Sequence, residues 1–523
     1  MRFYDRVRDL TLELAGIESV NGGGGEDRLL ERAYVMLSGL GGPGRLRVFR
    51  GAGEDGRPAF VLAHLVGRDR RAVLLFGHVD TVGIEDYGAL SEFALDPPDL
   101  TRRVADGALG PDLARVAAGG DWLFGRGVLD MKSGLAAGIA WLEAALEDPA
   151  AGHLLLGLTA DEEGGSRGMR ALTAFLAPYL AEEGLELAGA VNTDATGPLR
   201  GARHGPERFL YTGSIGKLLP CALVLGRPSH AGEPEAGLDP NLLLAEITRR
   251  VVYARDLGEQ VGAEEFAPPV ALLARDQKTG YDVQTARSAV AAYNVLYARR
   301  SPGEILARFA SVARLAAREA HERRAAALGG MAVPPVLTLQ DVLARLDRGA
   351  EHALRAALAG TLGQGAGPIE RIAAATRIAE SALGGEPAVV LFFGAGPIVP
   401  VASSRSARPV LERAVARVAA PAEQYTVRQF FPLISDLSLL GGPQGGPDAA
   451  FTANEPRSAL FGADPASPLT SDALFMVGPH GEGAHRIDER VYTPYSFERL
   501  PELLAAICRE LWLRPGRPAG EEA

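Results

Sequence analysis

His78 and Asp80 are the first residues in the chain whose types and spacing could support metal chemistry. They follow the apolar run 72–75, which predicts a buried strand of a parallel sheet. Ligand sites in such sheets gather at the carboxyl edge of the strands. Residues two apart in an extended segment point the same way, so we expect the Asp80 carboxylate to orient the His78 ring. Taken alone, the two residues are equally compatible with a hydrogen-bonded structural pair.

Similar polar residues recur at four later points of the chain. Two apolar runs end in acidic residues, the start of a helix-forming segment carries an Asp, and a late apolar run precedes a His. These candidates are Glu162 with Glu163, Asp194, Asp130 and His485. Each alone has an ordinary explanation, such as a solvated loop, a helix N-cap or a surface side chain. Their common position at strand ends or a helix start predicts that they meet in one site.

The candidates comprise two imidazoles and three carboxylates, with Glu162 as a further acid beside them. Imidazole and carboxylate ligands suit zinc and its first-row neighbours. One catalytic zinc uses three protein ligands, whereas two ions sharing a bridging carboxylate would use all five and leave room for a bridging hydroxide. Glu162 and Glu163 alternate in direction if they extend a strand. Glu162 is therefore better suited to take a proton from the metal-bound water.

The order of these motifs resembles the M20 family of metallopeptidases and amidohydrolases. The order is His-x-Asp, Gly-x-Gly-x-x-Asp-Met-Lys-Ser-Gly, Asp-Glu-Glu-Gly, Asp and a late His. The resemblance covers roughly residues 1–255 and 395–510. Within the family, the chain is most similar to the arginine-utilisation RocB subgroup, through the segments 281–285 and 430–438 and through its length.

The resemblance implies two bound divalent metal ions, with zinc expected and cobalt or manganese as alternatives. It implies that one carboxylate bridges the ions, that Asp80 orients a histidine ligand, and that Glu162 is the general base and later the acid. The ligand sets that it implies are His78, Asp130 and Asp194 for one ion, and Asp130, Glu163 and His485 for the other.

His230 is a further candidate, in a loop between the strand-like run 219–225 and a helix that starts near 239–240. A loop donor aimed at an oxyanion can contribute about 3–4 kcal/mol. The resemblance implies that such a His reaches the active site from the smaller domain, often from the partner subunit. It therefore also implies a homodimer formed through that domain. The alternative is that Ser229 and His230 simply cap the loop.

The fold expected is α/β with two domains, because 523 residues exceed one ordinary domain. Helix and strand alternate over the first ~210 residues, which predicts a doubly wound layer. We expect a discontinuous metal-binding catalytic domain at 1–213 and 401–523. An α+β lid or dimerisation domain would interrupt it at 214–400, enlarged by helices over about 300–385. The first of these helices is predicted from a capping box that begins at Ser301.

Composition excludes several functional classes. The net charge of −11 and the lack of any Lys/Arg run argue against a nucleic-acid partner. No window approaches 18 uninterrupted apolar residues, so no membrane span is expected. The charged start does not read as a signal peptide, and the two cysteines imply no disulfide framework. We therefore expect a cytoplasmic protein.

The candidate metal site, together with the resemblance, implies a metal-dependent hydrolase that cleaves an amide bond in a short peptide or an N-acyl amino acid. A metal-bridging hydroxide would attack the carbonyl while Glu162 shuttles the proton. The alternative is a catalytically silent accessory or binding protein in arginine or amino-acid catabolism, on the same scaffold. Such a protein would normally have lost a ligand or the base, and every position is intact here. Asp436 is interpreted as a turn residue and His480 as a loop residue.

Overall fold

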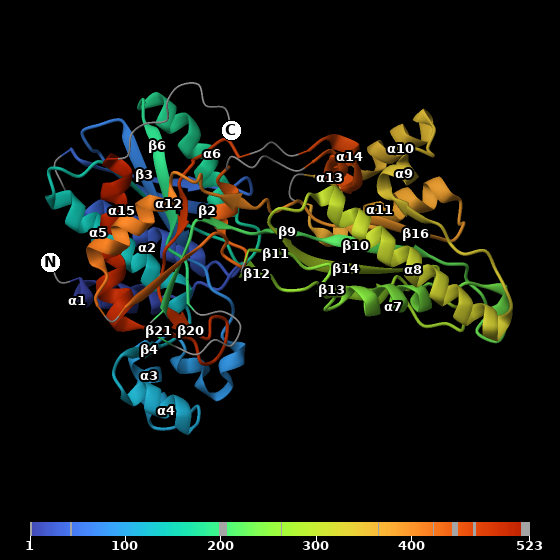
Figure 1. The fold of residues 1–523 in the computed structure, drawn as a ribbon, viewed down its shortest axis with the longest axis horizontal. Coiled ribbons are helices and arrows are strands. Elements are labelled where there is room, and N and C mark those ends of the chain that lie inside the picture. The colour runs from blue at the N-terminus through green and yellow to red at the C-terminus, as the bar shows by residue number, and fades with distance from the viewer. Residues whose placement is uncertain are drawn as a thin grey trace. The chain divides into compact units, whose positions relative to one another are not determined.

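The computed structural model describes residues 3–41, 44–197, 205, 207–262, 264–363, 366–421, 423–441, 448–463 and 467–513. The chain divides into two compact units (Figure 1). The first comprises Met1–Ser214, Val401–Gln444 and Ser467–Ala523, and the second comprises Ile215–Pro400 and Gly445–Ala466. The last of these segments was expected in the catalytic domain. It belongs to the second unit because Phe451 and Leu460 pack into that unit's hydrophobic cores.

An eight-stranded sheet forms the centre of the first unit. Its strands run in the order β1 (Leu46–Ala52), β2 (Pro58–Leu65), β5 (His153–Thr159), β3 (Arg71–His78), β6 (Glu186–Asn192), β19 (Leu474–Met476), β7 (Glu207–Tyr211) and β18 (Gln424–Arg428). The central strands β5, β3, β6 and β19 are parallel, whereas β1, β2 and β5 pair antiparallel. The carboxyl ends of the four parallel strands therefore lie at one edge of a mixed sheet.

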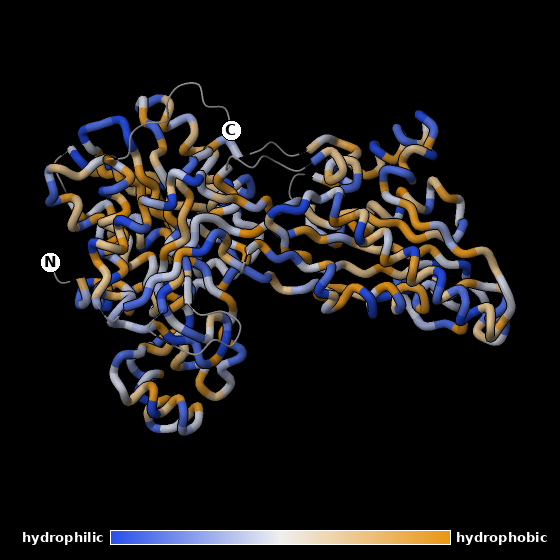
Figure 2. Tube along the Cα trace, viewed as in Figure 1, coloured by the Kyte–Doolittle hydropathy of each residue, from blue (hydrophilic) through white to orange (hydrophobic). Residues whose placement is uncertain are grey.

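Helices cover both faces of this sheet, because alternate strand residues point to opposite faces and both sets are apolar. One face packs against α1 (Tyr4–Ala15), α2 (Gly25–Gly39), α5 (Ser133–Glu147), α12 (Arg408–Val418) and α15 (Leu500–Leu513). The other packs against α6 (Arg167–Glu182) and the 3-10 turn η4 (Asp436–Leu439). In Figure 2 the apolar colour follows the strands and the helices packed on them. The α/β fold class predicted from the sequence is confirmed.

A small lobe of the first unit was not predicted. It contains the 3-10 segment η1 (Glu85–Phe93), α3 (Pro97–Ala105), α4 (Pro111–Ala118) and the strands β4 (Trp122–Phe124), β20 (Gly481–Glu482) and β21 (Arg490–Tyr492). Tyr87, Leu100, Val104 and Phe124 form its own hydrophobic cluster. Because β21 pairs with β4, the lobe joins the segment before Asp130 to the segment after His485.

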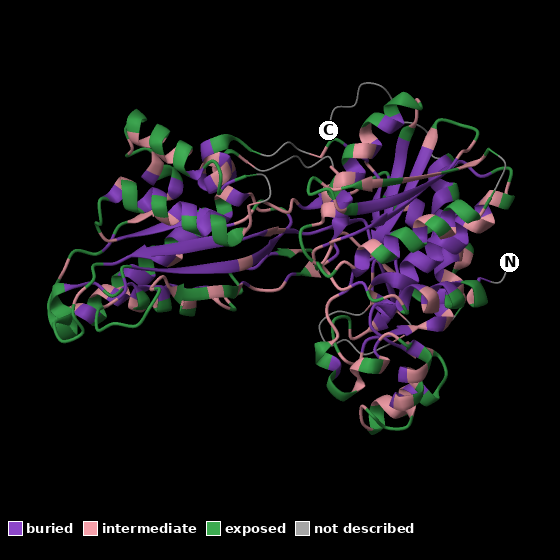
Figure 3. Ribbon diagram, turned by 180° about the vertical axis from the view of Figure 1, so that it is seen from behind, coloured by how far each residue is buried: buried purple, intermediate pink, exposed green. Residues whose placement is uncertain are grey.

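The second unit is built on a sheet with helices on both faces. Its strands are β13 (Val270–Asp276), β14 (Ser288–Tyr297), β10 (Pro220–Leu225), β16 (Ala388–Phe393) and β15 (Val336–Thr338), with β9 (Gly216–Leu218) beside β14. One face packs against α7 (Pro240–Val251) and α8 (Pro302–Leu328). The other packs against α9 (Leu339–Leu343), α10 (Arg348–Leu358) and α11 (Pro368–Leu383). Figure 3 shows buried strands in the middle of this sheet, where β10, β14 and β16 are buried along almost their whole length.

The extra helices of the second unit have a clear packing role. The predicted capping box is present, because Ser301 Oγ accepts the Glu304 N–H while the Glu304 carboxylate accepts the Ser301 N–H. It opens α8, as the sequence predicts. The helices α9, α10 and α11 bury the second face of the sheet, which water would otherwise reach. None of the helices in the described part of the chain has the length and apolarity that a membrane span requires.

Candidate metal centre

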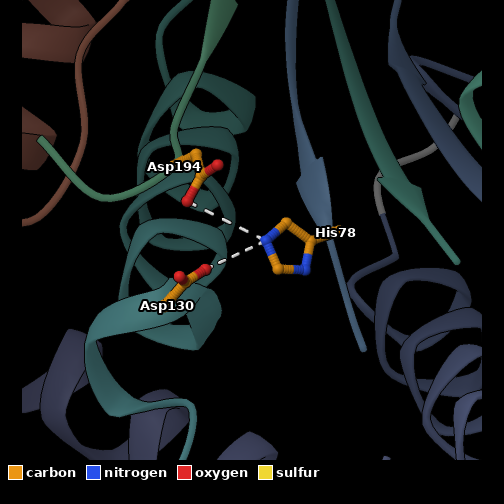
Figure 4. Close-up of side chains that lie close together, drawn as sticks. All are labelled: His78, Asp130 and Asp194. Atoms are coloured by element: carbon orange, nitrogen blue, oxygen red, sulfur yellow. Dashed lines mark hydrogen bonds and ion pairs between the residues drawn. The ribbon is translucent and has the colours of Figure 1, made fainter. Parts of the chain in front are cut away.

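His78, Asp130 and Asp194 come together at the carboxyl edge of the eight-stranded sheet (Figure 4). His78 is the last residue of β3, and Asp194 lies two residues beyond the end of β6. His78 Nε2 is 3.1 Å from Asp130 Oδ1 and 3.8 Å from Asp194 Oδ1. The three side chains thus point at one another from segments that the sequence separates widely.

A second group forms around the other oxygen of Asp130. His485 Nε2 lies 3.2 Å from Asp130 Oδ2 and 2.6 Å from Glu163 Oε1. Within each group, the candidate ligand atoms lie within 4.8 Å of one another. The five residues therefore form two groups that share Asp130, each of its oxygens facing a different imidazole. Two imidazoles and three carboxylates are donors that suit zinc and neighbouring first-row ions.

Close backbone packing at two glycines holds the strand ends and α5 together. A Cβ on Gly134, in the first turn of α5, would lie 1.9 Å from the Thr193 carbonyl oxygen. One on Gly478 would lie 1.8 Å from the Asp194 carbonyl oxygen. Such contacts are far too short for any side chain. These glycines therefore allow the Asp130 segment and the strand β19 to approach the Asp194 loop.

The structure corrects the predicted partner of the His78 ring. Nδ1 of His78 is 3.0 Å from the main-chain oxygen of Asp80, whereas the Asp80 carboxylate is 3.7 Å away. That carboxylate accepts the N–H groups of Glu162 (3.2 Å) and Glu163 (3.0 Å) and the side-chain amide of Asn21 (3.1 Å). Because a carbonyl only accepts, Nδ1 donates to Asp80, which leaves Nε2 to face the carboxylates of Asp130 and Asp194. Asp80 thus orients His78 through its carbonyl and holds the Glu162–Glu163 turn through its carboxylate.

The electrostatics of the cluster are strongly perturbed. Hydrogen bonds to Asp130 and Glu163 raise the pKa of His485 to about 11. Burial, together with the charge of Asp130, raises the pKa of Asp194 to about 6. Burial also raises the pKa of Glu162 well above its ordinary value; the charges of Asp436, Asp194 and Glu163 act in the same direction, and His78 opposes them. A carboxyl with a raised pKa suits proton transfer near neutral pH.

Metal binding at pH 7 is expected to release protons. The raised pKa of His485 means that the metal-free protein holds a proton there, and a ligating imidazole must lose it. Affinity for Zn²⁺ should therefore rise with pH, by about tenfold per pH unit for each proton released. Calorimetric titration in two buffers with different protonation enthalpies measures the number of protons. A binding enthalpy that is the same in both buffers would contradict the protonated state of His485.

Asp436 and His480 were predicted to be a turn residue and a loop residue, and the charges of the site affect Asp436. Asp436 begins the turn η4, as expected, but it is also buried, and Oδ1 has no hydrogen-bond partner among the described residues. Burial, with the charges of Asp80 and Asp194, raises its pKa to about 7, against the opposing effects of Ser166 and His78. His480 belongs to neither group of candidate ligands in the described residues. Its Nε2 lies 3.4 Å from Arg208 Nη1.

His230 belongs to the second unit, whereas the candidate metal ligands belong to the first. It occupies the loop between β10 and α7 and is exposed. The Gly232 N–H donates to its Nδ1 at 3.0 Å. An accepting Nδ1 leaves the proton of a neutral ring on Nε2. His230 therefore presents an N–H donor from an exposed loop.

The first unit is a mixed α/β fold with imidazoles and carboxylates gathered at its sheet edge, and these side chains are the donors of a candidate metal site. Residues 74–510 match the model of Peptidase family M20/M25/M40, and the chain belongs to this family. The uncharacterized protein YqjN of Bacillus subtilis (strain 168) is 32% identical over 99% of this chain and 98% of its own. The protein RocB of the same organism is 30% identical over 96% of this chain and 94% of its own.

Solved structures agree with this assignment at the level of the fold. A tripeptidase from Staphylococcus aureus subsp. aureus Mu50 superimposes with a TM-score of 0.56 at 14% identity, covering 98% of this chain and 100% of that one. The likeness to the M20 family and to RocB inferred from the sequence motifs is confirmed.

Proposed function

We propose that this protein is a metal-dependent hydrolase that cleaves the amide bond of a short peptide or an N-acyl amino acid. The observation that carries the proposal is the sharing of Asp130 between two groups of candidate ligands. Membership of a peptidase family supports amide hydrolysis as the reaction class. The intact base position, Glu162, argues against a silent accessory protein on the same scaffold.

The proposed cofactor is a pair of divalent ions, zinc first, with cobalt or manganese as alternatives. Bound there, the ions would polarise the substrate carbonyl and lower the pKa of an attacking water. Asp130 would bridge them. The remaining ligands would be His78 and Asp194 on one side, and Glu163 and His485 on the other.

The protein's own residues supply proton transfer and positioning. Glu162 takes the proton from the attacking water and passes it to the leaving nitrogen, which its raised pKa favours. Asp80 fixes the turn that carries Glu162 and Glu163 by accepting both of their N–H groups. His230 donates from Nε2 to the oxyanion that develops on the substrate carbonyl.

His230→Ala is expected to lower the turnover rate by about 10²–10³-fold, because it removes one oxyanion donor. The metal content should not change, since His230 is in neither ligand group. His352→Ala, which removes an exposed histidine from α10 of the same unit, is the matched control and should leave the rate unchanged.

The oligomer proposed for the protein is a homodimer formed through the second unit, with His230 acting across it. Mixing His230→Ala and Glu162→Gln subunits should then restore part of the activity, because one site of each hybrid has both residues. An absence of rescue in verified hybrids would leave His230 acting in its own subunit's site or not at all.

A substrate panel tests the reaction class most directly. Metal-reconstituted protein is assayed on peptides with a free amino end, peptides with a blocked amino end, and N-acyl amino acids. We expect turnover of at least one class, abolished by a chelator and restored by added Zn²⁺. Fully metal-loaded protein that hydrolyses none of them would contradict the proposal.

A further inference from the structure

Glu489 lies four residues after His485 and is fully buried against the segment that carries Asp130. Its Oε1 accepts the main-chain N–H groups of Leu129 at 3.2 Å and Asp130 at 3.3 Å. Its Oε2 accepts from Arg126 Nη1 at 2.7 Å. The Glu489 carboxylate therefore binds both the backbone of Asp130, the shared candidate ligand, and the buried guanidinium of Arg126.

Arg126 extends this contact to a third segment. It is 1% exposed, and its Nη2 donates to Asp86 Oδ1 at 2.7 Å while its Nε donates to the Gly83 carbonyl at 3.1 Å. Residues 83–86 follow the strand that ends in His78. The Arg126–Glu489 pair thus joins the segment after His78, the segment before Asp130 and the segment after His485.

This pair bears on the orientation of Asp130. The Asp130 backbone is not helical, with φ −118° and ψ 92°, although it lies directly before α5. Its N–H and that of Leu129 are held by Glu489, and buried N–H groups are costly to leave without an acceptor. Because Oδ1 and Oδ2 of Asp130 face different imidazoles, a shift of this backbone would displace both oxygens at once.

We propose that Glu489, paired with Arg126, is a positioning residue that sets the affinity of both metal sites together. It acts through the backbone of Asp130 and contacts neither ion itself. The proposal rests on the ligand sets of the proposed function. No motif predicted from the sequence included either residue, and neither belongs to a group of candidate ligands among the described residues.

Glu489→Gln tests the proposal, because a single amide oxygen cannot serve Arg126 and both N–H groups. Metal-free protein is titrated with Zn²⁺ against a chelator of known affinity. We expect both binding steps to weaken by about 10–100-fold, the usual effect of losing a partner that orients a ligand. An effect on only one step would overturn the shared mechanism.

Glu455→Gln is the matched control. Glu455 is also buried, pairs with the buried Arg371 and accepts the N–H groups of Arg457 and Ser458, but it lies in the second unit. We expect a comparable loss of thermal stability and an unchanged affinity for Zn²⁺. Wild-type affinity in Glu489→Gln, or equal weakening in Glu455→Gln, would overturn the proposal.

The double variant Arg126→Met/Glu489→Leu tests the same proposal if Glu489→Gln does not fold. Replacing a buried ion pair by apolar residues often preserves stability, yet it removes the acceptor for the two N–H groups. The same weakening of both steps is expected, and wild-type affinity would again overturn the proposal. Wild-type protein that binds fewer than two ions would instead contradict the proposed function, so the two failures are distinguishable.

Discussion

Glu162→Gln is expected to lower amide turnover by about 10²–10⁴-fold while both metal ions stay bound. The amide has the size of the carboxyl but cannot accept the proton of the attacking water. Glu162 is in neither group of candidate ligands, so its loss leaves the donors of both ions in place. The rate is measured with saturating Zn²⁺, and metal content is measured on the same sample.

Glu163→Gln provides the matched comparison for this result. The substitution is the same and the position is adjacent, but Glu163 faces His485 at 2.6 Å and belongs to the second ligand group. It should lose one ion together with activity. A near-normal rate in metal-loaded Glu162→Gln would show that another group transfers the proton.

Asp130→Asn is expected to weaken the binding of both ions, by more than the roughly 10–100-fold that the loss of an outer partner costs. Its two oxygens face the imidazoles of His78 and His485 separately, so one neutral substitution affects both groups. Metal per chain after dialysis against a weak chelator measures the effect. Retention of one ion at wild-type affinity would contradict the bridging role.

Asp194→Asn is the control for the bridging role, because Asp194 belongs only to the group that contains His78. It should weaken one binding step and leave the other unchanged. The contrast between the two Asp→Asn variants separates the loss of a shared ligand from a general loss of negative charge.

Much of the candidate site was predictable because it follows from strand ends. Parallel strands present their carboxyl ends at one edge, and β3 and β6 are neighbours, so the apolar runs that end in His78 and before Asp194 place these residues near each other. The capping box at Ser301 likewise marks the start of a helix through local hydrogen bonds alone. Where a local pattern determines the geometry, the sequence is sufficient to predict the structure.

Other features depend on partners that only the tertiary fold supplies. The Asp80 carboxylate does not hydrogen-bond the His78 ring, because its oxygens accept hydrogen bonds from Asn21 and from the N–H groups of residues 162 and 163. Glu489 and Arg126 are 363 positions apart, and a single charged residue in each segment gives no sign of the pairing. The small lobe was not predicted because its helices are short, although Asp96 before Pro97 is an N-cap signal.

The central claim is that two metal ions share Asp130, and anomalous diffraction from crystals of the zinc-loaded protein tests it most directly. Two anomalous peaks are expected about 3.5–4 Å apart, each at about 2.0–2.2 Å from a different oxygen of Asp130. One peak should lie beside His78 and the other beside His485. A map with a single peak, or with no peak at either Asp130 oxygen, would contradict the account.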